Sequence, residues 1–261
     1  MRRRNSNPEV LAISEHELTV MTNDLEQIHN DVGMPAMDRA VREWTERSRT
    51  SRRGFLIGVG AVAGGTILAA CSSGSSGSTT TTSGGSSGSS TAGKLTGDLA
   101  VAALAASLEN LAVAAYGDVL TAAGAGKLGT VPPAVSTFVT TVKGQHTQHA
   151  QAWNSAITAA GHPAVTTPDP VLTPVIVADF KRVTDVPGAA KLALMLEEVA
   201  GATYQSAVGA VKAMSSVQVA ASIQPVELQH AAILNFALGQ YPVPNAFSPL
   251  MNARPLTDYT G

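Results

Sequence analysis

The chain reads LENLAVAAY at residues 108–116 and LEEVAGATY at residues 196–204. These stretches are two copies of one motif, in which Glu109 matches Glu197 and Tyr116 matches Tyr204. Helical residues seven apart project from nearly the same face, so each copy places a carboxyl and a phenol in line. The doubled motif predicts a fold built from two similar helical halves.

A second motif also occurs twice. The tripeptide Gln-His-Ala surrounds His149 and again His230; His146 stands three residues before the first histidine and Glu227 three residues before the second. In a helix each such pair shares one face. Burying these ionisable groups without compensation would cost several kcal/mol per charge, by order of magnitude, and a divalent metal pair would compensate them. The alternative is a metal-free bundle in which His and Glu pair with one another.

Four long segments have helical periodicity, and alanine runs without alternation argue against strands. The first and last pairs are joined by short turns, whereas about 25 proline-rich residues, with a short helical piece near 175–182, join the second to the third. A connection of that length can run the length of a helix. The sequence therefore predicts an all-α four-helix bundle with a long crossover between its second and third helices. The expected helices are 94–124, 133–160, 187–214 and 216–238.

The front of the chain differs in composition. Residues 1–53 carry nine of the 17 Lys and Arg and nine of the 19 acidic residues with a patchy apolar pattern, which indicates a polar leader without chemistry of its own. A start at Met34 or Met37 would leave a more ordinary basic region. Arg52 and Arg53 precede an uncharged apolar run, the pattern of twin-arginine export, and the run ends at Cys71.

Small residues before the lone cysteine are typical of a lipoprotein signal, in which Cys71 takes a lipid and becomes the mature N-terminus. A retained anchor is the alternative, but the run falls short of the roughly 20 residues needed to span a bilayer. We therefore expect three parts: leader and signal at 1–71, a Ser/Gly/Thr linker at 72–94, and a helical domain at 95–261.

The expected partners are the twin-arginine export machinery and the membrane, the latter through the lipid on Cys71. We expect the domain on the outer face of the cytoplasmic membrane or in the cell envelope, as a monomer or small oligomer. Residues 94–261, which include the expected helical domain, carry eight basic and ten acidic residues and have no basic patch, so nucleic acid is not an expected partner.

With its doubled Glu motif, its doubled Gln-His-Ala motif and the crossover, the chain resembles the ferritin-like superfamily, most closely an exported, desiccation-related and uncharacterised bacterial branch. The resemblance covers nearly all of the expected domain. It implies two metal ions with terminal ligation by Glu109, Glu197, His149 and His230, and with Glu227 as a bridge.

His146 departs from that pattern, because it stands where the family usually has a second bridging carboxylate. It shifts the site towards nitrogen donors, which suit iron, zinc or copper better than calcium or magnesium. Iron is expected, with manganese, zinc and copper as alternatives, and a single-metal site stays open. Tyr116 and Tyr204 are expected to form a hydrogen bond with a metal ligand, to donate an electron, or to pack in the core with the hydroxyl satisfied there. Glu198 is expected beside the ligands or facing solvent.

The leading functional hypothesis is an exported, lipid-anchored di-metal protein, an oxidase, ferroxidase or enzyme of peroxide chemistry. Its alternative is a non-enzymatic metal-binding or stress-protective envelope protein, and a metal-free interaction module is the third class. The pattern identifies no catalytic residue beyond the expected metal ligands.

Overall fold

A computed structural model of the chain describes residues 10–47, 95–245 and 249–257. The regular structure of these residues is helical throughout and includes no strand, which confirms the predicted all-α class. Arg52, Arg53, Cys71 and the linker 72–94 lie outside the described residues. The elements are α1 (Glu15–Ile28), the π-helical turn η1 (His29–Gly33), helical residues 34–47, α3 (Asp98–Gly124), α4 (Pro133–Ala159), α5 (Thr173–Phe180), α6 (Val186–Ala210) and α7 (Met214–Ala237).

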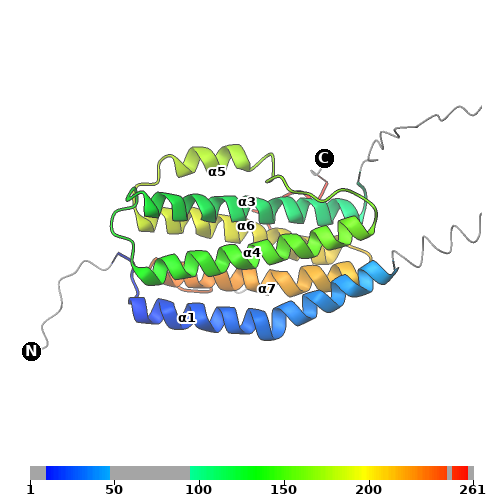
Figure 1. Ribbon diagram of the computed structural model, residues 1–261, viewed down its shortest axis with the longest axis horizontal. Helices are drawn as coiled ribbons and strands as arrows, with labels where there is room; N and C mark the ends of the chain where they lie inside the picture. Colours follow the sequence, from blue (N-terminus) through cyan, green and yellow to red (C-terminus); the bar gives the residue numbers. More distant parts are fainter. Residues whose placement is uncertain (1–9, 48–94, 246–248, 258–261) are drawn as a thin grey trace, which may run out of the picture.

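Helices α3, α4, α6 and α7 lie side by side as a four-helix bundle (Figure 1). α3 packs chiefly against α4, and α6 against α7, so the bundle consists of two helical hairpins. The long connection between α4 and α6 contains α5, which packs on α6. This is the predicted crossover, and it lets the two hairpins present equivalent faces to one interior.

Polar side chains fix the hairpins and the crossover relative to one another. Asp98, at the start of α3, accepts hydrogen bonds from the backbone N–H groups of Lys212 and Ala213, which precede α7. A carboxylate at a helix N-terminus satisfies amides that have no partner within the helix. Asn110 of α3 donates to the carbonyl of Val165 at 2.9 Å and so holds the crossover on the bundle.

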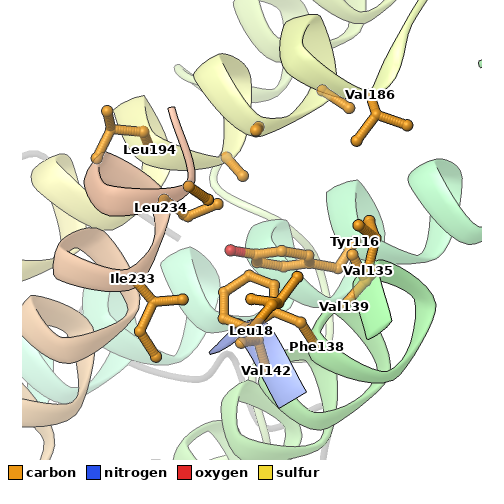
Figure 2. Close-up of a cluster of buried hydrophobic side chains, with 14 of the residues drawn as sticks. Leu18, Tyr116, Val135, Phe138, Val139, Val142, Val186, Leu194, Ile233 and Leu234 are labelled. Atoms are coloured by element: carbon orange, nitrogen blue, oxygen red, sulfur yellow. The ribbon is translucent and has the colours of Figure 1, made fainter. Parts of the chain in front are cut away.

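Two large apolar clusters fill the bundle, one around each tyrosine of the doubled motif, and a smaller third cluster joins α3, α5 and α6. Figure 2 shows the first, in which the ring of Tyr116 lies among side chains that include Phe138, Val139 and Leu234. The second surrounds Trp153 and Tyr204. Since both tyrosines belong to the doubled motif, the charged residues of that motif lie between two apolar regions.

By length and composition α3 could cross a membrane, and no other helix among the described ranges meets that test. However, 67% of its most apolar window is buried inside the bundle. An apolar helix that is covered on most sides by other helices is explained as the core helix of the bundle.

The largest difference from the sequence-based expectation concerns residues 10–47, whose composition predicts part of a polar leader. α1 packs along α4 and also contacts α7 (Figure 1). Leu18 and Leu25 join the first apolar cluster, and Trp44 joins the second, with its ring edge-to-face against Trp153 at a centroid distance of 6.1 Å. Residues 10–47 therefore form an additional helical layer on the four-helix bundle, called the N-terminal layer below.

The buried face of this layer has a regular spacing that a polar composition hides. Leu18, Thr22, Leu25 and His29 follow at steps of four, three and four residues, and all four are buried. The π turn η1 then inserts one extra residue, next to Pro35, which has no backbone N–H to donate. The buried face resumes in the helix that follows, with one residue of phase shift, at Met37, Ala40 and Trp44.

Candidate metal centre

Six side chains from the four bundle helices converge in the interior. Each is at most 1% exposed. They offer nitrogen and oxygen atoms that form two groups, in each of which the atoms lie within 4.8 Å of one another. One group is Glu109, His146, His149 and Glu227; the other is His146, Glu197, Glu227 and His230. The structure thus brings together every residue that the sequence indicated as a ligand.

His146 and Glu227 belong to both groups. The Nδ1 atom of His146 lies 2.7 Å from Oε2 of Glu109, and its Nε2 atom lies 3.2 Å from Oε1 of Glu197. One imidazole therefore reaches the carboxylates of both halves. Glu227 lies between the groups, where the family resemblance implied a bridging carboxylate.

The other two histidines have matching arrangements. His149 Nδ1 lies 3.0 Å from Oε1 of Glu227, and His230 Nδ1 lies 3.2 Å from Oε2 of Glu197. Both imidazoles thus direct Nδ1 towards the carboxylates. This is the nitrogen that each would offer to a metal ion shared with those carboxylates.

Charge pairing perturbs these groups strongly. Burial works against ionisation of Glu109, but the charges of His149 and His146 outweigh it and lower the pKa of Glu109 to about 2. Burial likewise disfavours protonated His149, yet Glu109 and Glu227 raise its pKa to about 9. The pKa of Glu197 is lowered well below its ordinary value, because His146 and His230 outweigh its burial. Without a cation, protons on the imidazoles balance the carboxylates.

Glu227 has three imidazoles at ion-pair distance, with Nδ1 of His149, His230 and His146 lying 3.0, 3.7 and 3.8 Å from its oxygens, yet it is the carboxylate that favours a metal pair. Both of its carboxylate oxygens are buried and neither accepts a hydrogen bond, although His149 Nδ1 is at ion-pair distance. A buried carboxylate without hydrogen-bond donors is costly. A cation between the two groups would satisfy these oxygens, so the donor set fits a bound metal pair.

Tyrosines hold the terminal carboxylates in a reciprocal manner. Tyr116 of α3 donates to Glu197 of α6, and Tyr204 of α6 donates to Glu109 of α3. Burial, followed by the charge of Glu109, raises the pKa of Tyr204 well above its ordinary value, so its hydroxyl keeps its proton. The tyrosines therefore orient metal ligands by donating hydrogen bonds to them, which is one of the roles that the sequence allowed.

Glu198, for which the sequence allowed a place beside the ligands or in solvent, is exposed to solvent.

Sequence reasoning missed three residues around the site. Gln145 accepts from Nε2 of His230 at 2.6 Å, and Gln148 does the same for His29 at 2.8 Å. Burial, followed by the charge of His149, lowers the pKa of His29 to about 4, so this imidazole is neutral near pH 7. The glutamines could have been found from the Gln-His pair that occurs at 145–146 and again at 148–149. His29 could have been found from the helical spacing of the buried residues in α1.

A bundle with a crossover, in which all four helices contribute buried Glu and His side chains that could hold metal ions, has the architecture of a ferritin-like domain. The sequence model of the ferritin-like domain family matches residues 97–240. This match spans more than half of the chain, and the protein belongs to that family. The matched range includes α3 to α7 and leaves out α1 and η1. No curated protein and no solved structure gives a significant match.

Proposed function

We propose that the protein is an exported, lipid-anchored ferritin-like protein that holds two metal ions, with iron as the expected metal, and uses them in redox chemistry with oxygen or peroxide. The observation that carries the metal pair is the overlap of two four-ligand groups through His146 and Glu227. A pair of redox-active ions supplies two electrons at one place. The protein itself supplies ligands, orientation and the exclusion of water.

In this proposal each half of the bundle holds one ion. Glu109 and His149 serve one, Glu197 and His230 serve the other, and Glu227 lies between them. The tyrosine hydroxyls fix the terminal carboxylates, and complete burial keeps competing water away from the donors. Such fixed donors act at low cost because they are oriented before the metal enters.

The small size of an apolar cavity beside Tyr116 favours a small oxidant over a large substrate. The cavity has a volume of about 40 Å³ and is lined almost entirely by apolar side chains, including Leu18, Val119 and Phe138. Since one water-sized probe needs roughly 10–15 Å³, the space suits a molecule of a few atoms. Tyr116 also lines this cavity and donates to Glu197, so it links the cavity with the ligand set.

The burial of the donors favours a second candidate, a non-enzymatic metal-binding or stress-protective envelope protein. All six ligands are at most 1% exposed, which suits an ion that is held rather than turned over. Oxygen or peroxide consumption by the metal-loaded protein separates the candidates. Turnover supports the redox enzyme, whereas tight binding without turnover supports the holding role.

The anchoring part of the proposal is supported by the sequence pattern of Arg52, Arg53 and Cys71. Mass spectrometry of the membrane fraction from expressing cells tests it. A lipid-modified peptide that begins at Cys71 is expected, and Cys71→Ser should release the protein from the membrane. Detection of an unprocessed, unmodified Cys71 in exported protein would contradict the anchor.

Elemental analysis tests the metal centre directly. Protein folded in the cytoplasm should contain about two ions per chain, as a dinuclear site requires. Glu227→Gln should lose at least one ion, because its carboxylate belongs to both ligand groups. The matched control is Glu198→Gln, an equal change at an exposed residue in α6. Equal metal contents in the two variants would overturn the assignment.

A further inference from the structure

His29 belongs to the N-terminal layer, outside the matched family domain, yet it lies against the metal centre. Its side chain is 2% exposed, and its ring lies edge-to-face against His149 with a centroid distance of 5.3 Å. Its Nε2 atom pairs with Oε1 of Gln148. Since an amide oxygen only accepts, Nε2 carries the proton and Nδ1 of His29 is left as an acceptor.

The pairing of His230 shows what a ligand histidine needs here. Its Nδ1 atom faces Glu197, while Nε2 donates to the amide oxygen of Gln145. This outer hydrogen bond fixes the tautomer and the ring orientation, which is the usual arrangement of metal-binding histidines. His149 occupies the equivalent position in the other half, so its Nε2–H needs an acceptor too.

The bundle does not supply that acceptor at the equivalent place. Aligning His149 with His230 places Gln145 opposite Val226, whose side chain is buried and has no polar atom. Among the described residues, Nε2 of His149 and Nδ1 of His29 are both buried without a hydrogen-bond partner. Nε2 of His149 is a hydrogen-bond donor when Nδ1 of the same ring binds a metal, and Nδ1 of His29 is an acceptor.

We propose that His29 is the outer hydrogen-bond acceptor of His149 in the metal-loaded protein, so that the N-terminal helical layer completes the metal centre. The two rings are already in edge-to-face contact at a centroid distance of 5.3 Å, and the proposed hydrogen bond between their unpartnered nitrogens forms when Nδ1 of His149 binds a metal ion. His29 is thus a positioning residue, itself oriented by Gln148. This role rests on the proposed metal-binding function.

Zinc titration of the full chain against a competing chelator tests the role. His29→Phe keeps a ring of similar size but removes the acceptor, and we expect it to lower zinc affinity about 10–100-fold, the usual effect of losing an outer partner. His29→Gln restores an acceptor and a donor to Gln148, and should bind within about threefold of the wild type by the same reasoning. The matched control is His16→Phe, at an exposed position of α1.

Two further measurements separate positioning from folding. The metal-free His29→Phe protein should unfold at an unchanged or higher urea concentration, because an apolar ring replaces a polar one in a buried place. In zinc-loaded protein labelled with ¹⁵N-histidine, the Nε2 resonance of His149 should shift in His29→Phe and return in His29→Gln. A packing role alone would leave that resonance in place.

Equal zinc affinity in the wild type and both His29 variants would overturn the inference while leaving the metal centre intact. Equal loss in His29→Phe and His29→Gln would also overturn it, since His29 would then be a direct ligand. A wild-type chain that binds no zinc, iron or manganese would overturn the proposed function itself, and this outcome is recognisable because no variant is needed to see it.

Discussion

The hydroxyl of Tyr204 donates to Oε1 of Glu109 at 2.5 Å and accepts from Nε1 of Trp153 at 2.8 Å. Tyr116, its counterpart in the doubled motif, donates to Glu197 but makes no second hydrogen bond within the described part of the chain. The two tyrosines thus hold equivalent carboxylates in different ways. Tyr204 joins a metal ligand to the second apolar cluster, whereas Tyr116 faces the small cavity.

This asymmetry predicts unequal costs for removing the hydroxyls. Tyr204→Phe leaves Oε1 of Glu109 and the indole N–H of Trp153 without a hydrogen-bond partner. After Tyr116→Phe, Oε1 of Glu197 still faces Nε2 of His146 at 3.2 Å. Each buried group that loses its partner costs about 1–3 kcal/mol. Urea unfolding of the metal-free protein should therefore show the larger loss for Tyr204→Phe. Equal losses would mean that the Trp153 contact adds nothing to stability.

His146→Glu tests the unusual nitrogen donor. In the metal-free protein the change adds a fourth carboxylate to the site and removes an imidazole that reaches Glu109 and Glu197. Uncompensated buried charge costs about 3–5 kcal/mol, so the metal-free variant should unfold at lower urea. Manganese or iron should restore more stability than in the wild type, and selectivity against zinc should rise. The unfolding midpoints with and without each ion measure this; an unchanged metal preference would contradict it.

The metal-free protein should lose stability above neutral pH. The pKa of His149 is about 9 in the folded chain against an ordinary value of 6.5, so its contribution is fully present below pH 6.5 and disappears as the pH rises through 9. The raised pKa values of His146 and His230 act in the same direction. A bound metal replaces the protons, so stabilisation by metal should grow over the same range. Urea midpoints at each end of this range, with chelator and with metal, check both signs.

The bundle was predictable because its signals are local and repeated. Four alanine-rich segments, two prolines at the start of α4 and a long proline-rich connection each point to the same fold, and the structure places the four bundle helices within a few residues of their expected bounds. The ligands were predictable for a similar reason. Glu109, His149, Glu197 and His230 recur at equivalent positions in two copies, which chance pairs of buried residues would not do.

The N-terminal layer was not predicted, because two of the buried residues with which it faces the bundle are polar. Thr22 donates its hydroxyl to the carbonyl of Leu18 within α1, whereas the partner of His29 is Gln148 of α4, which cannot be read from α1 alone. The π turn then shifts the phase of the apolar face. One local signal was available, the Ser14 and Glu17 capping box that begins α1. Glu198 shows the opposite limit: only the helix orientation decides that it faces solvent.

The proposed lipoprotein processing cuts the chain before Cys71, between the N-terminal layer and the bundle. Residues such as Leu18, Leu25 and Trp44 are buried against the bundle, so cleavage of the chain alone should not release the layer. A protease site introduced into the linker 72–94 of the full chain provides the cut. The N-terminal layer should co-elute with the bundle in size-exclusion chromatography, and the zinc affinity of the cut protein should match that of the uncut protein. Leu25→Asp buries a charge in the contact between the layer and the bundle and should separate the two pieces.

If the layer separates from the bundle in the cut protein without a substitution, processing would remove His29 from His149. The processed form should then bind zinc about 10–100-fold more weakly.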